Sequence, residues 1–235
     1  ALDVEILQMM GVINGVSATQ FDPNGTLTRA QFTKMAVVIL GKNDQISSYQ
    51  NYTIFPDVKS SHWASGYINL AVRGEEKFIA GFADGTFRPD QNITFGQAIT
   101  ILMRLLGYTD ADVGMTWPSG YISAAAAAGL TDGVSLGGDS VISRAQAAKL
   151  FVNLLNTNQK EGAKTFGETV ATQVKKDILI LDGNAKAEDG SPASETTDGI
   201  VKLASSHTTQ LITGQRSHVL LHSRGGARDS IPRPP

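Results

Sequence analysis

Three stretches of the chain share one spacing of apolar residues. In each stretch, five apolar positions recur every three or four residues, which is the spacing of one face of an α-helix. They are Phe32, Met35, Ala36, Ile39 and Leu40, then Ala98, Ile101, Leu102, Leu105 and Leu106, and finally Ala147, Leu150, Phe151, Leu154 and Leu155. The pattern predicts three equivalent helices, and therefore an internal repeat that determines the architecture.

Polar residues mark the ends of these helices in the same way. A Thr or Ser that can cap the N-terminus is followed three residues later by Gln, as in a capping box. The pairs are Thr28 and Gln31, Thr94 and Gln97, and Ser143 and Gln146. Gly41, Gly107 and Asn156 follow the apolar positions, and Gly and Asn are the residues that best close a helix in the left-handed conformation.

The chain divides accordingly into three repeats. The first covers residues 1–44 and is incomplete at its N-terminus, which we expect to be processed or truncated. The second covers residues 54–108 and the third covers residues 112–157. We expect a first helix in each repeat, starting near His62 in the second, then a turn and the capped helix. Because one short helix pair cannot bury such an apolar face alone, the capped helices should pack around one pseudo-threefold axis.

The other segments are more polar. Residues 45–53 are a predicted linker. Residues 165–213 are interpreted as β-like, and residues 214–235, which are rich in Arg and Pro, as a disordered tail. The strand candidates are residues 177–184, 199–203 and 210–213.

Composition narrows the function classes. The chain has 235 residues, of which 41% are hydrophobic and 18% charged, and its net charge is -2. This charge gives no general attraction to nucleic acid or to a membrane surface, and no apolar run is long enough for membrane insertion. We also expect no signal peptide in this chain. The absence of cysteine excludes disulfides and thiolate metal sites, and it fits a secreted bacterial protein.

Catalytic and metal-binding patterns are weak. The sequence has no Gly-rich phosphate loop and no nucleophile elbow, so we predict a protein without enzymatic activity and without a cofactor. The loop at residues 22–26 lacks the alternating acids and the closing Glu of a calcium-binding EF-hand. His218 and His222 have the four-residue spacing of zinc ligands on a helix, but they fall in the predicted disordered tail. We therefore predict no metal site.

The second repeat resembles the S-layer homology family. The resemblance rests on Phe55-Pro56-Asp57-Val58, His62-Trp63-Ala64, Ile79-Ala80-Gly81, Asp84-Gly85-Thr86-Phe87-Arg88-Pro89 and Ile93-Thr94. The family's helix-opening motif Thr-Arg-Ala-Glu appears as Thr28-Arg29-Ala30-Gln31 and as Ser143-Arg144-Ala145-Gln146. In the second repeat the same positions read Thr94-Phe95-Gly96-Gln97, without the Arg.

The resemblance covers residues 1–157 and implies a mainly α fold, in which three helix-loop-helix repeats form a three-pronged pseudo-trimer. It implies an extracellular protein that binds secondary cell-wall polysaccharide, in many members through a pyruvylated sugar, in the grooves between repeats. Such a protein anchors a surface protein to the bacterial wall. Two alternatives stay open: the anchor portion of a surface polysaccharide-active enzyme, and an S-layer lattice subunit with lattice neighbours as partners.

The repeats also predict an anion site. Arg29 and Arg144 follow the cap residues, so each guanidinium should lie beside unpaired N–H groups at a helix N-terminus, near Gln31 and Gln146. This combination suits a carboxylate such as that of a pyruvyl group, although the alternative is a solvated Arg. Because Phe95 replaces the Arg, we predict that its groove is weak. Arg29→Ala or Arg144→Ala should weaken binding roughly ten- to a hundredfold at its own site.

Five more residues complete the predicted ligand-binding set. Trp63 and Trp117 could stack a flat apolar face on a sugar ring, although aromatic residues more often anchor a core. Asp57 and Asp84 flank the turn of the second repeat and could equally make turn hydrogen bonds. Arg88 lies in the same turn and could replace the Arg that is missing from this repeat.

Overall fold

The computed structural model describes residues 2–15, 21–114 and 116–174. The helices in these ranges are α1 (Leu2–Met9), α2 (Arg29–Ile39), the 3-10 helix η1 (Asn43–Gln45), α3 (Ile46–Tyr49), α4 (Ser65–Arg73), α5 (Phe95–Leu105), α6 (Asp110–Val113), α7 (Ser119–Ala127), α8 (Arg144–Asn156) and α9 (Phe166–Val174). Within the same ranges, extended pairing is limited to isolated bridges. The predicted mainly α fold is confirmed.

Two of the three predicted capping boxes are complete. The hydroxyls of Thr28 and Ser143 accept hydrogen bonds from the N–H three residues later, and the Gln side chains return to the cap N–H groups. In the second repeat Thr94 accepts from the Gln97 N–H, but the Gln97 side chain does not return. The prediction for Gln97 was therefore wrong, because this side chain points into a cavity described below.

The helix ends follow the prediction in two repeats. Gly41 and Gly107 have φ values of 81° and 92°, the left-handed conformation that closes a helix at low cost with glycine. Asn156 is instead the last residue of α8, and Thr157 caps that helix in an extended conformation. Its hydroxyl donates to the carbonyl oxygen of Asn153 at 2.8 Å, so a side chain satisfies the helix end without a left-handed residue.

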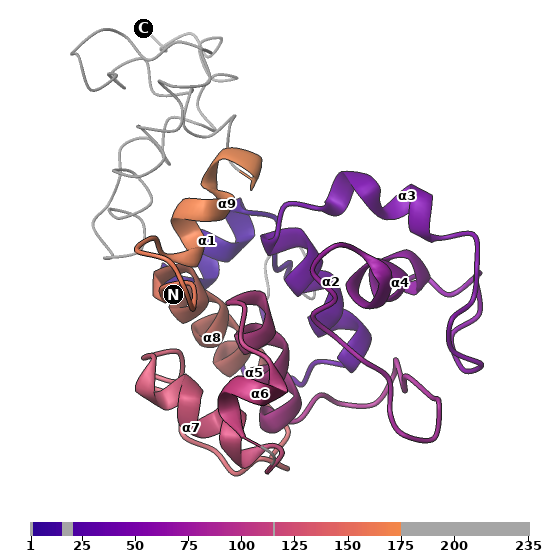
Figure 1. Ribbon diagram of the computed structural model, residues 1–235. Coiled ribbons are helices and arrows are strands. Elements are labelled where there is room, and N and C mark those ends of the chain that lie inside the picture. Colours follow the sequence, from indigo (N-terminus) through magenta and orange to yellow (C-terminus); the bar gives the residue numbers. More distant parts are fainter. Residues whose placement is uncertain (1, 16–20, 115, 175–235) are drawn as a thin grey trace, which may run out of the picture. The chain divides into compact units, whose positions relative to one another are not determined.

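Each prong of the fold combines two repeats. Figure 1 shows α4 against α2, α7 against α5, and α1 against α8, and these pairs, together with α3 and α4, are the extensively packed ones. The first helix of each repeat thus packs on the capped helix of the preceding repeat. The pair α1 and α8 closes the ring, because it joins the first repeat to the third.

The capped helices meet at the centre. Helix α5 contacts both α2 and α8, and the rings of Phe32 on α2 and Phe151 on α8 have centroids 4.9 Å apart. Ile39, Leu105 and Leu154, which are equivalent in the three repeats, are all buried. This arrangement agrees with the predicted pseudo-threefold packing.

Backbone bridges follow the same cyclic order. Residue pairs bridge each capped helix to the loop of the next repeat: Thr28 with Asn92, Thr94 with Val141, and Ser143 with Thr26. The first N–H of each capped helix then donates to a loop carbonyl oxygen: Arg29 to Gln91, Phe95 to Ser140, and Arg144 to Gly25, each at 2.8 Å. The helix N-termini are therefore satisfied by protein rather than left open.

Three segments differ from expectation. Helix α4 begins at Ser65 rather than near His62. The predicted linker at residues 45–53 contains the short helix α3, which packs on α4 and is held by hydrogen bonds from the Asn69 side chain. The β-like interpretation of residues 165–213 is wrong for Phe166–Val174, which is helical. The three strand candidates and the predicted tail lie outside the described residues.

Candidate functional site

Arg29 joins the first repeat to the second. Its side chain is buried, and its Nε donates to the carbonyl oxygen of Phe87 at 3.0 Å while a terminal nitrogen donates to that of Ala80 at 2.6 Å. The guanidinium carbon lies 4.9 Å from the ring centre of Phe82 and 4.7 Å from that of Phe87, as in cation–π contacts. The alternative of a solvated side chain is therefore wrong for Arg29.

Arg144 repeats this arrangement between the third repeat and the first. Its Nε donates to the carbonyl oxygen of Phe21 at 2.9 Å, and a terminal nitrogen donates to that of Asn14. These carbonyls lie 66 residues before the ones that Arg29 contacts. Because backbone carbonyls also occupy the helix N-terminal N–H groups, the predicted pairing of guanidinium with free N–H groups is not present. An anion here would bind the guanidinium itself.

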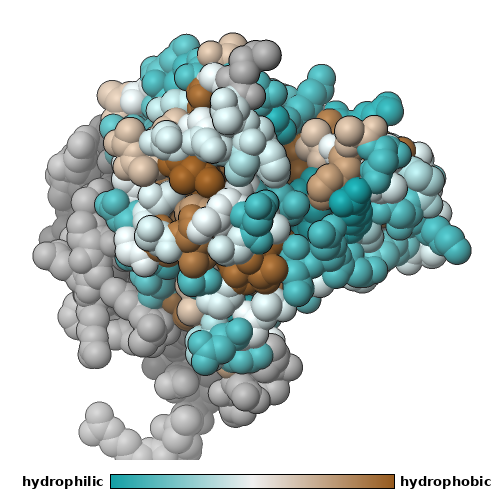
Figure 2. All heavy atoms as spheres, turned by 90° about the horizontal axis from the view of Figure 1, so that it is seen from below, coloured by the Kyte–Doolittle hydropathy of each residue, from teal (hydrophilic) through white to brown (hydrophobic). Residues whose placement is uncertain are grey.

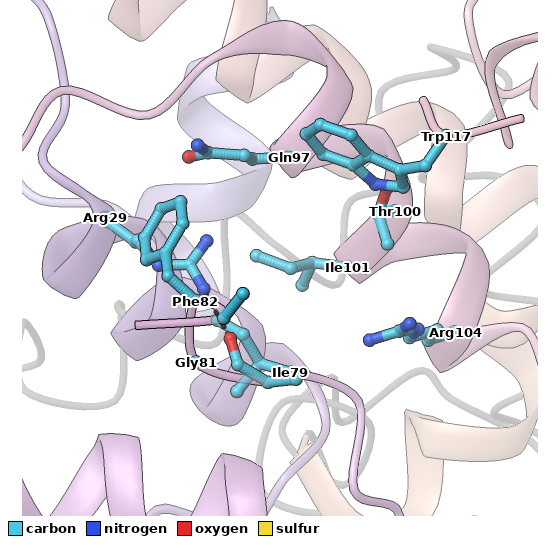
Figure 3. A pocket seen from close by; sticks show the side chains of 11 residues that line it. Arg29, Ile79, Gly81, Phe82, Gln97, Thr100, Ile101, Arg104 and Trp117 are labelled. Carbon is cyan, nitrogen blue, oxygen red and sulfur yellow. Dashed lines mark hydrogen bonds between the residues drawn. The ribbon is translucent and has the colours of Figure 1, made fainter. Parts of the chain in front are cut away.

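A cavity of about 340 Å³ lies where all three repeats meet. Arg29 comes from the first repeat, Trp117 from the third, and the remaining lining residues from the second. These are Ile79, Ala80, Gly81, Phe82, Ala83, Gln97, Thr100, Ile101 and Arg104. Figure 3 shows Arg29 and Arg104 on opposite sides of Ile101, with Trp117 beside Thr100. We call this space the Arg29 cavity; its volume is within the range of small-ligand pockets, about 300–1,000 Å³.

Arg29 carries a positive charge that no carboxylate in the described part of the chain pairs with. Among the residues that the structure describes, it forms no ion pair, and its described hydrogen bonds go to neutral carbonyl groups. Burial, then repulsion from Arg88 and Arg104, lowers the pKa of Arg29 to about 10, so it stays charged at neutral pH. A buried cation of this kind is stabilised by an anion that enters beside it.

Arg104 is held in place by Asp110 on α6 and by Tyr121 on α7. Its Nε donates to the hydroxyl of Tyr121 at 3.3 Å, and a terminal nitrogen donates to Oδ1 of Asp110 at 2.9 Å. The Tyr121 hydroxyl donates to the same Asp110 oxygen at 2.6 Å. Burial alone would lower the pKa of Arg104, but the contacts with Tyr121 and Asp110 outweigh burial and raise it.

Two groups on α5 add polar character to the cavity wall. Gln97 is 9% exposed, and its Oε1 is buried without a hydrogen-bond partner among the described residues, which costs free energy unless a ligand or water donates to it. The Thr100 hydroxyl accepts from the Trp117 indole N–H at 3.0 Å and donates to the Gly96 carbonyl oxygen at 2.8 Å. Trp117 is 54% exposed, so a fixed indole presents an open face.

The predicted glutamines serve the helix caps. The Oε1 atoms of Gln31 and Gln146 accept hydrogen bonds at 2.8 Å from the N–H groups of Thr28 and Ser143. A ligand that bound these oxygens would have to displace the caps. The structure gives no direct support for a ligand role of either side chain.

The predicted loop residues stabilise the turn of the second repeat. Asp57 accepts from the backbone N–H of Phe87 at 3.0 Å and of Arg88 at 2.6 Å. Asp84 accepts from the Thr86 hydroxyl at 2.6 Å and pairs with Arg88 at 2.8 Å; these contacts, that of Thr86 first, lower its pKa. Arg88 lies over the Phe82 ring at 4.0 Å and not beside Phe95 in the described contacts.

Trp63 is exposed on the surface rather than buried in the core. It is 50% exposed, its ring stacks on His62 with centroids 5.7 Å apart, and Tyr67 lies 6.5 Å away. The core alternative was therefore wrong for Trp63, as it was for Trp117. On the face shown in Figure 2, hydrophobic residues of the described part form separate patches among hydrophilic ones.

The structure thus brings two predicted residues, Arg29 and Trp117, into one cavity and leaves the others outside it. Sequence analysis missed Gln97, Thr100 and Arg104 as lining residues. The available signal was the departure of the second repeat from the other two. At the position of Arg104 the first repeat has Val38 and the third has Asn153, and at that of Thr100 both have Lys.

Comparison with known proteins agrees with this architecture. The sequence profile described as "S-layer homology domain" matches residues 3–33, 54–99 and 109–148. Each of these segments overlaps one of the three repeats. The chain belongs to the S-layer homology family.

The relatives that share these repeats include cell-wall and cell-surface proteins and an enzyme. The "Middle cell wall protein" of Brevibacillus brevis is 28% identical over 177 residues, which are 75% of this chain and 16% of that protein. The "Cell surface protein" of Thermoanaerobacter kivui is 30% identical over 202 residues, 82% of this chain and 26% of the relative. The "Amylopullulanase" of Thermoanaerobacterium thermosulfurigenes is 29% identical over 172 residues, 65% of this chain and 9% of the enzyme. The matched region is thus a minor part of each relative.

The described ranges lack two structural features. Within these ranges, no helix combines the length and the apolar character needed to cross a membrane. They also contain no group of three or more His, Cys, Asp or Glu side chains placed to hold a metal ion. His218 and His222 lie outside the described residues.

Proposed function

We propose that this chain is a non-enzymatic anchor, which holds a surface protein on the bacterial cell wall by binding an acidic secondary wall polysaccharide in the Arg29 cavity. The observation that carries this proposal is the buried charge of Arg29, which has no ion-pair partner among the described residues. The relatives named after the cell wall and the cell surface support the location.

The chemistry of the cavity favours a carboxylate on a sugar. A guanidinium has five N–H donors in one plane, and the two that Arg29 gives to Phe87 and Ala80 leave three for a ligand. Charge-assisted hydrogen bonds of this type are the strong ones. A pyruvyl ketal on a wall sugar would supply the carboxylate, while its hydroxyl groups could donate to the free Oε1 of Gln97.

Trp117 supplies the apolar side of the proposed site. Sugar rings have C–H faces that pack on flat aromatic surfaces, and the indole of Trp117 is both open and fixed by Thr100. The three repeats then contribute different parts: a cation, a polar helix face and an aromatic platform. A ligand in this cavity would contact all three repeats.

Anchoring is compatible with different attached proteins. The match to the amylopullulanase covers 9% of that enzyme, so most of that protein lies outside the shared region. We infer that the described repeats serve attachment whether the whole protein is structural or enzymatic. An S-layer lattice role would require further surfaces that the described residues do not identify.

Co-sedimentation with sacculi tests the proposal. Wild-type chain should sediment with sacculi of Brevibacillus brevis and stay in solution after acid extraction has removed the non-peptidoglycan polymer. The matched variant Arg29→Met keeps the side-chain bulk but not the charge, and it should sediment weakly with untreated sacculi. Equal sedimentation with extracted and untreated sacculi would contradict binding to the polymer.

A further inference from the structure

The three capped helices do not carry their cations at the same position. Along the capped helix, Lys34 in the first repeat is equivalent to Thr100 in the second, and Val38 is equivalent to Arg104. The second repeat therefore has no cation at the first of these positions and has one four residues later, one helical turn along the same face.

Both cations lie against the same feature of the next repeat. The Arg104 guanidinium carbon is 5.6 Å from the ring centre of Tyr121, and the Lys34 Nζ is 5.9 Å from that of Tyr67. These tyrosines are equivalent, because Tyr67 follows Trp63 by four residues and Tyr121 follows Trp117 by four. The fold thus keeps a cation on this tyrosine at two junctions between repeats, although the cation comes from different turns of the helix.

The partners of the tyrosines differ in charge. The Tyr67 hydroxyl donates to the neutral amide oxygen of Asn43 at 3.0 Å, whereas the Tyr121 hydroxyl donates to the carboxylate of Asp110. Asp110 also accepts a hydrogen bond from a terminal nitrogen of Arg104. The carboxylate therefore accompanies the arginine and fixes the plane of its guanidinium.

This fixed guanidinium faces the Arg29 cavity. Arg104 has five N–H donors, of which the described contacts use one on Nε and one on a terminal nitrogen. In Figure 3 the guanidinium extends from α5 toward the side of the cavity where Arg29 lies, and Ile101 lines the wall between the two. Two cations on opposite walls repel each other unless an anion lies between them.

We propose, resting on the proposed function, that Arg104 is a second anion-binding residue of the Arg29 cavity, positioned by Asp110 and Tyr121, and that the acidic group of the wall polysaccharide lies between Arg29 and Arg104. Arg104 then acts together with Arg29 to distinguish acidic from neutral saccharide units in this cavity. Val38 and Asn153 cannot provide this contact in the other two grooves.

Titration calorimetry on four variants tests this inference, with polymer released from Brevibacillus brevis sacculi as the probe. Arg104→Gln removes the charge and should weaken binding about tenfold, the value of one charge-assisted hydrogen bond. Polymer whose carboxylates have been chemically reduced should bind wild type and Arg104→Gln equally weakly. Arg73→Gln removes one positive charge from the exposed end of α4 and should bind like wild type.

The positioning role has a test of opposite sign. Asp110→Asn makes the cavity more positive, so a general attraction between charges would strengthen binding to an acidic polymer. If Asp110 orients Arg104, the same variant weakens binding several-fold, and Tyr121→Phe, which keeps the buried ring, weakens it similarly. Equal or tighter binding by Asp110→Asn would overturn the positioning role, and equal binding by Arg104→Gln would overturn the contact.

The outcomes also separate this inference from the function on which it rests. Absence of polymer binding by wild type would refute the proposed function. Binding by wild type with unchanged Arg104→Gln would refute the inference alone. Thermal unfolding of each variant identifies a loss that is due to misfolding, and Asp110→Asn and Tyr121→Phe then decide the matter without any change at Arg104.

Discussion

The junctions between repeats are of two kinds. At the junctions made by Arg29 and Arg144, a guanidinium crosses from a capped helix and binds two carbonyl groups of the next repeat. At the third junction the equivalent residue is Phe95, which is 1% exposed. Here the hydrogen bonds to the carbonyl groups come from Asn153 instead, since its Nδ2 donates to the carbonyl oxygens of Leu130 and Asp132 at 2.9 Å.

This difference shows how one repeat can give up a ligand group without losing the fold. The Asp132 carbonyl corresponds to those of Ala80 and Asn14, which the arginines bind. The side-chain amide of Asn153, from the same repeat, donates to the Asp132 carbonyl oxygen, so no charge has to be buried at this junction. The arginine junctions instead hold a cation whose spare donors can serve a ligand. The apolar junction stabilises the ring but offers no such charge.

Placing an arginine in the apolar junction should have the largest effect. In Phe95→Arg the guanidinium would enter a site whose acceptor is already used by Asn153. A buried charge without a partner costs about 3–5 kcal/mol. Urea denaturation should show this loss in the free energy of unfolding.

The double variant Phe95→Arg with Asn153→Ala sharpens this prediction. Removing the amide frees the Asp132 carbonyl for the new arginine, so the double variant should be less destabilised than the sum of the single variants. Strict additivity would mean that the junctions are not interchangeable in the way that the equivalent carbonyls indicate.

Removing an arginine should have the next largest effect. Arg29→Met keeps the apolar contacts with Phe82 and Phe87 but leaves two carbonyl groups without a donor. We expect a loss of about 3 kcal/mol in the free energy of unfolding, since hydrogen bonds to charged groups contribute about 1.5–3 kcal/mol each. Chemical denaturation measures it directly.

Arg144→Met is the matched control for this variant. It removes the same contacts at another junction and should destabilise the chain by a similar amount. Polymer binding in the Arg29 cavity should fall far more in Arg29→Met than in Arg144→Met. Equal losses of binding would mean that Arg29 acts only through stability.

A smaller effect is expected from Gly96→Ala. A Cβ at this position would lie 2.7 Å from Cβ and 2.8 Å from Cγ of Pro118, and 3.1 Å from the Gly138 carbonyl oxygen. Pro118 and the attached Trp117 must then shift, which costs about 1–3 kcal/mol as in other overpacked sites. Calorimetric titration should also show weaker polymer binding. Gly96 therefore contributes to the site because its missing side chain leaves space for Pro118, although we assign it no ligand contact.

The smallest effect concerns pH. Hydrogen bonds from Tyr121 and then Arg104 lower the pKa of Asp110, so its carboxylate stabilises the fold above its ordinary pKa of about 3.9. That stabilisation is lost as the pH falls through the lowered pKa. Wild type should be more stable than Asp110→Asn near neutral pH, and their thermal midpoints should converge in acid. A constant difference across this range would contradict the network.

The sequence predicted the positions of the helices better than it predicted which helices pack together. The apolar spacing located α2, α5 and α8, and the cap residues located their first turns, because both depend on neighbouring residues along one helix. The spacing does not tell which helix covers each apolar face. Helix α4 packs on α2 of the preceding repeat rather than on α5 of its own repeat. This choice of partner depends on the length and course of the loops.

The site was predicted less completely for a related reason. Arg29 repeats in Arg144, so alignment of the repeats found it. Arg104 and Thr100 occur in one repeat, and their partners Asp110 and Trp117 belong to segments that the fold, not the sequence, places beside them. Sequence analysis did not predict that Oε1 of Gln97 lacks a partner among the described residues. The capping-box spacing instead predicts that this oxygen accepts from the backbone N–H of Thr94.

One measurement tests the central claim most directly: titration of wild-type chain with wall polymer before and after chemical reduction of the polymer carboxylates. A cavity built around the buried charge of Arg29 should bind the native polymer and lose most of its affinity for the reduced one. Equal affinity for both polymers would contradict recognition of an acidic group by this cavity.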